Sequence, residues 1–169
     1  MPTADLASPS LPLLPGLSAD DAALLAGQLV SRSLAPGEVL LRAGGTERVL
    51  VWIQSGAVEV RVDIDGQRFT IDHFGPGALF GELGFFDPDH TRAADVVATA
   101  ACEALILPFS AYAALVSAGE PVVVAVEEQV LAQLGARMAA TSQRLGDLLA
   151  RRDQPSAWQA LRRFLGLGA

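Results

Sequence analysis

Short apolar runs separated by turn residues fill the chain from residue 33 to residue 108. The clearest runs are VLVWIQSG, AVEVRVDI, QRFTIDHF, RAADVVATA and CEALILP, which are β-rich and bounded by Gly, Pro or Asp. Asp65 and Gly66 separate the second run from the third, and this dipeptide suits the two-residue type I′ turn of a β-hairpin. Many short strands joined by regular turns predict a mainly β fold, either a sandwich or a jelly-roll barrel.

The first arm of this hairpin alternates between apolar and polar residues. The alternation predicts one apolar face, made of Val58, Val60, Val62 and Ile64. The opposite face is predicted to be polar and consists of Glu59, Arg61, Asp63 and Asp65.

Helical patterns flank the β region on both sides. Ser18 and Asp21 form a capping-box arrangement that predicts a short helix over about residues 19–31. The run FSAYAALVSA predicts a second short helix, and a Gly-Glu-Pro sequence ends it. A long helix is predicted to follow over residues 121–152.

The long predicted helix carries an apolar seam with the a/d spacing of a coiled coil, at Leu131, Leu134, Met138, Thr141, Leu145 and Leu148. A small barrel cannot bury such a stripe along a helix that projects from it, whereas a symmetric parallel dimer buries it. We therefore predict a homodimer through residues 121–152. The alternative is that the stripe packs back onto the chain's own barrel.

Four segments follow from these patterns. They are a flexible Pro-rich leader at 1–16, a barrel domain at 17–120, the long helix at 121–152 and a short amphipathic helix at 153–169. In the last segment Trp158, Leu161 and Leu165 share one face, and arginines make this end of the chain basic. Three interpretations of this segment stay open: packing on the barrel or the dimer helix, docking to a partner protein, and contact with a membrane surface.

Composition narrows the class of protein. The 169 residues are 51% hydrophobic and carry a net charge of −7, which fits one soluble domain and argues against a nucleic-acid-binding surface. The single cysteine, Cys102, excludes a disulfide framework and lies in an apolar run, so we expect a core residue in a reducing cytoplasm. No apolar run reaches the roughly 18 residues of a membrane-spanning helix, and the N-terminus lacks the charge pattern of a secretory signal.

Enzyme chemistry finds little support in the sequence. A metal-dependent enzyme on a jelly roll needs clustered histidines, but the two histidines present, His73 and His90, lie far apart in the chain. Motifs for a nucleophile elbow or a phosphate loop do not occur. We therefore expect a protein that is not an enzyme and binds no metal.

The segment FGELGFFDPDHTRAA, from Phe80 to Ala94, carries the strongest chemical signal. It separates a carboxylate, Glu82, from a guanidinium, Arg92, by a short apolar run and a polar loop. A carboxylate accepts a proton from a sugar hydroxyl, and an arginine grips phosphate oxygens with two parallel bonds. Gly81 permits a close approach of the backbone. An ordinary ion pair on a barrel rim is the alternative to a ligand site.

This segment resembles the phosphate-binding cassette of the cyclic-nucleotide-binding domain, as found in the bacterial cAMP receptor (catabolite activator) family. The resemblance implies a jelly-roll barrel in which Glu82 holds the ribose 2′-hydroxyl and Arg92 neutralises the cyclic phosphate. Backbone N–H groups near Gly81, Glu82, Ala93 and Ala94 would complete the anion site. By the same resemblance, the apolar walls beside the ligand would be Val60, Ile71, Phe74 and Leu83.

A second match lies in the long helix. The run TSQRLGDL resembles the part of the family's dimer helix that reaches the adenine of bound cAMP. The resemblance implies that Thr141 of one chain and Ser142 of the other contact the purine. Between the two matches the chain holds about four residues more than the family pattern, which is close to one helical turn. A threonine bonded to its own helix backbone is the alternative interpretation.

The resemblance also bears on the choice of base and on the output. Family members that prefer cGMP often carry Thr just after the cassette arginine, where this chain has Ala93. We therefore expect cAMP as the ligand. Because the chain after the long helix is too short for a helix-turn-helix domain, we expect a stand-alone cytoplasmic regulator that signals through an unknown protein partner. The alternatives are a dimeric interaction module whose barrel binds no nucleotide, and a receptor for cGMP or a cyclic dinucleotide.

Overall fold

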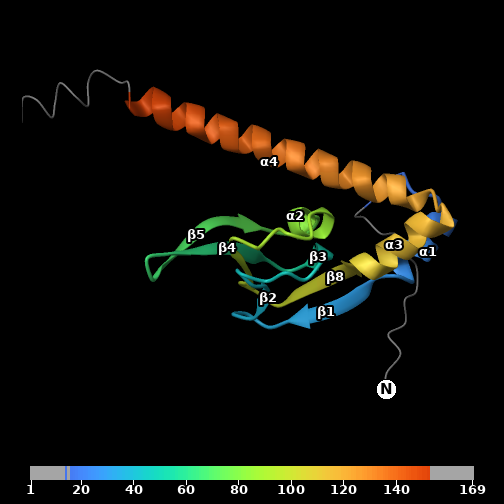
Figure 1. The fold of residues 1–169 in the computed structure, drawn as a ribbon. Helices are drawn as coiled ribbons and strands as arrows, with labels where there is room; N and C mark the ends of the chain where they lie inside the picture. Colours follow the sequence, from blue (N-terminus) through green and yellow to red (C-terminus); the bar gives the residue numbers. More distant parts are fainter. Residues whose placement is uncertain (1–13, 15, 153–169) are drawn as a thin grey trace, which may run out of the picture. The chain divides into compact units, whose positions relative to one another are not determined.

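The computed structural model describes residue 14 and residues 16–152 (Figure 1). The chain divides into two units, residues 1–130 and residues 131–169, and each is described by itself. Most of the predicted leader and all of the predicted C-terminal helix at 153–169 lie outside the described residues.

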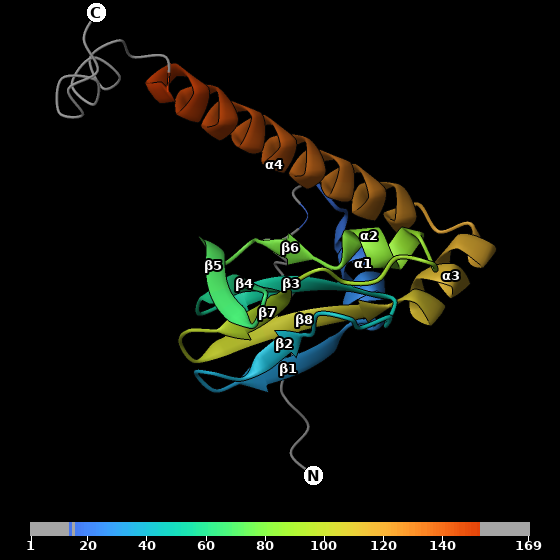
Figure 2. The same ribbon diagram turned by 60° about the vertical axis from the view of Figure 1, so that its left-hand side comes forward.

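Two four-stranded antiparallel sheets form the β region of the first unit. One sheet has the order β1 (Val30–Leu34), β8 (Cys102–Pro108), β3 (Val49–Ser55) and β6 (Leu79–Phe80). The other has the order β2 (Val39–Leu41), β7 (Asp95–Ala98), β4 (Val58–Ile64) and β5 (Gln67–Phe74), with β5 at its edge (Figure 2). The predicted mainly β fold with flanking helices is therefore confirmed.

An apolar core fills the space between the sheets, and we call it the inter-sheet core. It draws on strands of both sheets, and its buried members are Leu34, Leu40, Leu41, Val51, Ile53, Val58, Phe80, Val96, Ala98, Cys102 and Ala104. Cys102 is buried and unpaired, as expected from its apolar surroundings in the sequence. Two predicted wall residues, Val60 and Phe74, are half-buried and pack against this core.

Helices cover the other face of the sheet that contains β3. Leu50 and Trp52 alternate with the core residues of β3 and are also fully buried, so a second apolar layer must cover them. The Nε1 of Trp52 donates a hydrogen bond of 2.8 Å to the Oε1 of Gln129, which belongs to the first turns of α4 (Val122–Arg152). In α4, Val122 and Val126 are fully buried.

The first helix is shorter than predicted. Helix α1 (Ala19–Ala26) begins as expected at Ser18, whose hydroxyl accepts a hydrogen bond from the backbone N–H of Asp21. It ends at Ala26 instead of near residue 31, because Gly27 caps it and Val30 already pairs with Ile106 of β8. Pairing with a neighbouring strand thus overrides the local helical pattern. Helices α3 (Phe109–Ala118) and α4 lie where the sequence predicted them.

The β4–β5 hairpin has the predicted turn. Ile64 pairs with Gln67, and both turn residues have positive φ, 54° at Asp65 and 79° at Gly66, as a type I′ turn requires. The register shifts between Val60 and Arg61, so β5 carries one extra residue there.

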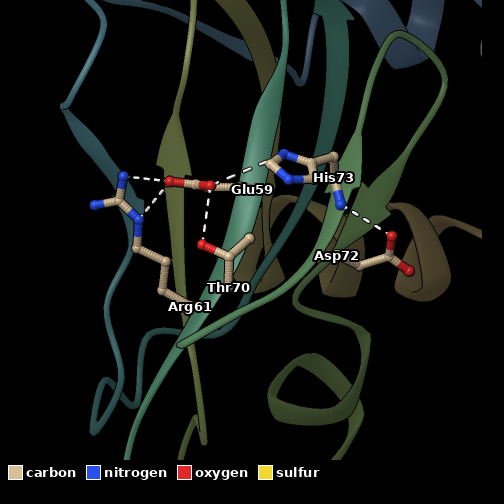
Figure 3. Close-up of polar contacts among 5 residues, drawn as sticks. All are labelled: Glu59, Arg61, Thr70, Asp72 and His73. Atoms are coloured by element: carbon tan, nitrogen blue, oxygen red, sulfur yellow. Dashed lines mark hydrogen bonds and ion pairs between the residues drawn. The ribbon is translucent and has the colours of Figure 1, made fainter. Parts of the chain in front are cut away.

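The two faces of β4 differ in part from the prediction. Val58 is fully buried as expected, but Ile64 is 56% exposed near the turn. On the predicted polar face, Glu59 is only 8% exposed, and Arg61 and Thr70 donate hydrogen bonds to its carboxylate (Figure 3). The alternation therefore assigns the faces correctly but does not reveal that the polar face includes a buried carboxylate.

Candidate functional site

The cassette segment begins with a backbone turn that only glycine fits. Gly81 follows β6 with φ 90°, and a Cβ at this position would lie 2.2 Å from the carbonyl oxygen of Val49. The single-turn helix α2 (Glu82–Phe86) starts immediately after it, and Phe85 N–H donates to the Gly81 carbonyl at 2.9 Å. The close backbone approach predicted at Gly81 is made here to strand β3.

Phe85 anchors α2 to the helical layer. Its ring is fully buried and makes edge contacts with Phe109 and Tyr112 of α3. Arg48 donates from Nε and Nη2 to the Phe85 carbonyl at 3.0 and 2.8 Å, and its guanidinium lies 3.3 Å from the centroid of the Phe109 ring. The sequence analysis missed Arg48, because an arginine at a strand start has no local signature.

Arg92 lies at the other end of the cassette, and its side chain is only 11% exposed. Its Nη1 lies 2.9 Å from the Oε2 of Glu47, and its Nη2 donates to the Glu47 carbonyl at 2.7 Å. The Arg92 backbone also pairs with the β2–β3 loop, since its N–H donates to Gly45 and its carbonyl accepts from Gly44. The guanidinium is therefore held in a fixed position by a loop that is distant in sequence.

Gly45 leaves room for this ion pair. A Cβ at Gly45 would lie 2.6 Å from the Oε2 of Glu47 and 2.9 Å from the Nη1 of Arg92. A hydrogen bond to its own backbone, and then the bond from Arg92, hold the pKa of Glu47 below its ordinary value of 4.5. Glu47 is thus an anionic partner of Arg92, and its side chain is 69% exposed.

A cavity of about 330 Å³ lies beside the Arg92 guanidinium. Its lining combines apolar side chains of β2, β3 and β8 with four charged residues, Arg32, Arg42, Glu47 and Arg92. Arg32 also donates hydrogen bonds to the carbonyls of Val39 and Leu40, at 3.1 and 3.3 Å. The lining therefore contains three arginines and one carboxylate, so the local charge favours an anion.

Glu82 does not line this cavity. It is half-buried at the start of α2, at the opposite end of the β6–β7 connection from Arg92. The joint grip of Glu82 and Arg92 on one ligand therefore stays a prediction.

The other predicted contact residues differ in exposure. Ile71 and Leu83 are 57% and 55% exposed, Ala93 is exposed, and Ala94 is half-buried. Thr141 and Ser142 are exposed on α4 and belong to the second unit, so their contact with a purine also stays a prediction.

Two further observations concern metal and membrane. Within residue 14 and residues 16–152, no cluster of three His, Cys, Asp or Glu residues could hold a metal ion. None of the helices described there has the length and apolar character needed to cross a membrane.

Comparison with known proteins identifies the family. The family model of the cyclic nucleotide-binding domain matches residues 31–118, which include the whole cassette and all of both sheets except Val30. The chain belongs to this family, and the resemblance seen in its sequence is confirmed.

Two of the similar proteins are named as regulators. The chain is 37% identical over 90 residues (53% of the chain) to the cAMP-dependent protein kinase type II regulatory subunit of Drosophila melanogaster, and 27% identical over 110 residues (64%) to the cAMP-activated global transcriptional regulator CRP of Escherichia coli. The matches span 24% and 50% of those proteins.

A solved structure gives the same fold. The catabolite activator protein of Thermus thermophilus superposes with a TM-score of 0.66 at 30% identity, covering 82% of this chain and 63% of that one.

Proposed function

We propose that this chain is a cAMP-binding regulatory protein that forms a homodimer through α4 and signals through a protein partner. The observation that carries the proposal is the placement of Arg92. Its guanidinium is nearly buried, fixed by loop contacts and bonded to a carboxylate beside a positively lined cavity. A guanidinium in such a site is suited to bind a phosphate in two-point geometry.

Ligand binding begins with an exchange of anions at Arg92. The cyclic phosphate takes the place of the Glu47 carboxylate, which returns to water at small cost because its side chain is 69% exposed. The bond from Arg92 to the Glu47 carbonyl keeps the guanidinium oriented during this exchange. Glu82 binds the ribose 2′-hydroxyl, and Val60, Ile71, Phe74 and Leu83 form apolar walls beside the ligand.

The homodimer rests on the exposed stripe of α4. Val124, Leu131, Met138 and Leu145 are 56%, 68%, 70% and 56% exposed and recur every seven residues. This is one seam position of a coiled coil, and a second copy of the same helix covers it. In the dimer, Thr141 and Ser142 then reach the purine, so cAMP favours one arrangement of α4 over others.

A packed route connects the cassette to α4. Phe85 of α2 packs on Tyr112, whose hydroxyl donates to the Oε1 of Glu127 in α4 at 2.5 Å. A movement of α2 on binding therefore acts on α3 and the base of α4 through direct contacts. The regulator has no catalytic role of its own in this proposal, and it works in the cytoplasm.

The test is isothermal titration calorimetry with cAMP. Wild type is expected to bind, and Arg92→Ala is expected to lose about 2–5 kcal/mol of binding free energy, because the phosphate loses its paired charge. Arg68→Ala serves as the matched control, because Arg68 is exposed beside the hairpin turn and its loss changes the net charge equally. Equal affinities of wild type and Arg92→Ala would overturn the proposal.

A second candidate function is a dimeric interaction module whose barrel binds no nucleotide. Two observations favour it: the Arg92 guanidinium already bonds Glu47 through both terminal nitrogens, and Glu82 does not line the cavity. This candidate predicts no heat with cAMP or cGMP, together with an intact dimer in sedimentation.

A further inference from the structure

We propose that the cavity beside Arg92 is a second ligand site, which binds a small organic phosphate of the monoester type. This site is additional to the cyclic-nucleotide site of the proposed function and shares only the Arg92 side chain with it. We call it the edge cavity, because much of its lining comes from β1 and β2, the edge strands of the two sheets (Figure 2). Its lining residues are Arg32, Val39, Leu40, Leu41, Arg42, Glu47, Val49, Arg92 and Ile106.

The edge cavity lies apart from the predicted nucleotide contacts. Among the described residues that line it, Arg92 is the one predicted contact. The other predicted contacts do not line it, and they are Val60, Ile71, Phe74, Gly81, Glu82, Leu83, Ala93, Ala94, Thr141 and Ser142. A ligand in the edge cavity therefore occupies a different part of the barrel from the ribose and the purine of the proposed nucleotide.

The charges of the edge cavity suit a dianion. Arg92 and Glu47 pair at 2.9 Å and offset each other's charge. Arg32 and Arg42 remain uncompensated, since no carboxylate in residue 14 or residues 16–152 forms an ion pair with either of them. A cyclic phosphodiester carries a single negative charge, whereas a phosphate monoester carries about 1.5 to 2 negative charges at neutral pH. The monoester therefore matches this pair of arginines better.

The guanidinium of Arg32 is held against β2. Its Nη2 donates to the Val39 carbonyl at 3.1 Å, and its Nη1 donates to the Leu40 carbonyl at 3.3 Å. These carbonyls are open to a side chain, because β2 is an edge strand whose register shifts between Val39 and Leu41. A guanidinium has five N–H donors, so these two bonds leave three donors for a ligand.

Arg42 begins a turn whose backbone is fixed at two points. Its carbonyl accepts from the Gly45 N–H at 3.2 Å, and the Ala43 N–H donates to the Oδ1 of Asp95 at 2.7 Å. The residue itself is exposed, and no described residue forms a hydrogen bond with its guanidinium. Arg42 can therefore bind an anion without losing an existing bond.

The rest of the lining is apolar and sets the kind of ligand. It consists of Val39, Leu40, Leu41, Val49 and Ile106. The volume of about 330 Å³ is at the lower end of the roughly 300–1,000 Å³ found for small-molecule pockets. Inorganic phosphate would leave this apolar surface in contact with water, whereas a short aliphatic or aromatic group covers it. An organic monoester therefore fits both the charge and the lining.

The experiment is calorimetry of the full chain with phenyl phosphate as the probe, in wild type, Arg42→Gln and Arg68→Gln. Arg42→Gln removes the charge but keeps a side chain with hydrogen-bond donors. We expect its Kd to rise about tenfold, since charge-assisted hydrogen bonds are worth roughly one such factor. Arg68→Gln is the matched control, because Arg68 is exposed beside the β4–β5 turn and its loss changes the net charge equally. An unchanged Kd in Arg42→Gln, or an equal rise in Arg68→Gln, would overturn the proposal.

Inorganic phosphate tests the organic part of the ligand. It carries a similar charge but no apolar group, so we expect it to bind at least about tenfold more weakly than phenyl phosphate. Equal affinities for the two probes would overturn the assignment of an organic ligand.

Titration with cAMP separates the second site from the proposed function. The Kd of Arg42→Gln for cAMP should stay within about threefold of wild type, because an exposed charge without a direct contact is worth little. If Arg42→Gln weakens cAMP and phenyl phosphate equally, the edge cavity belongs to the nucleotide site, and the second site is overturned while the function stands. If wild type binds cAMP but not phenyl phosphate, the second site alone fails. If it binds phenyl phosphate but not cAMP, the proposed function alone fails.

Discussion

The cassette and the long helix are two predicted parts of one ligand site, and they differ in how far their apolar side chains are buried. The cassette is packed within the first unit, since Phe85 is buried and contacts with the β2–β3 loop fix Arg92. The apolar stripe of α4 is exposed, since Leu131 and Met138 are 68% and 70% exposed. The difference indicates that the cassette packs with the barrel, whereas the described residues of the chain leave the stripe uncovered.

The largest expected effect is on the anchor of the cassette. Phe85→Ala is expected to lower the free energy of unfolding by about 3–5 kcal/mol, because it leaves a cavity among the rings of α2 and α3. Denaturant unfolding measures the loss. Phe86→Ala is the control, since Phe86 is 43% exposed, and a loss as large as that of Phe85→Ala would contradict the assignment of Phe85 as the anchor.

The second-largest loss of unfolding free energy is expected at Gly81, the glycine turn of the cassette. Gly81→Ala is expected to cost at least about 3 kcal/mol of unfolding free energy, because it adds backbone overlap with Val49 to the strain of a positive φ. Gly66→Ala has a similar φ of 79° but no atom within 4 Å of the added Cβ. Its cost is expected to be about 1 kcal/mol, and equal costs in thermal unfolding would refute the overlap argument.

The stripe of α4 is expected to behave in the opposite way. Met138→Lys should disrupt the dimer, because it places two positive charges, one from each chain, against each other in the coiled-coil seam. The free energy of unfolding of the barrel should stay within about 0.5 kcal/mol of wild type. Sedimentation velocity measures the mass. Unfolding followed by the fluorescence of Trp52, in a chain whose other tryptophan is removed by Trp158→Phe, measures the stability of the barrel. Gln143→Lys, on the outer side of the same helix, should leave the dimer intact. A dimer that survives Met138→Lys would exclude this seam.

The smallest expected effect is on the pH dependence of the melting temperature. Hydrogen bonds, the largest of them from Arg61, hold the pKa of Glu59 below its ordinary value of 4.5. A carboxyl with a lowered folded pKa stabilises the fold above its unfolded pKa, and this contribution disappears as pH falls through the folded pKa. The melting temperature should therefore decline below about pH 4.5, and Glu59→Gln should decline less. Identical declines would argue against a role for this carboxyl.

Local signals made much of the fold predictable. The Asp65–Gly66 hairpin and the long helix each follow from adjacent residues. The end of α1 did not, because pairing of β1 with β8 joins residues that lie far apart in sequence. The Arg92–Glu47 pair joins residues 45 positions apart, so no spacing pattern contained it.

The central claim concerns what the Arg92 guanidinium binds. A crystal structure determined with cAMP tests it most directly. We predict that the carboxylate of Glu47 leaves Arg92, and that the guanidinium forms two bonds of about 2.7–2.9 Å to the cyclic phosphate. A ligand bound elsewhere, with the Arg92–Glu47 pair intact, would contradict the account.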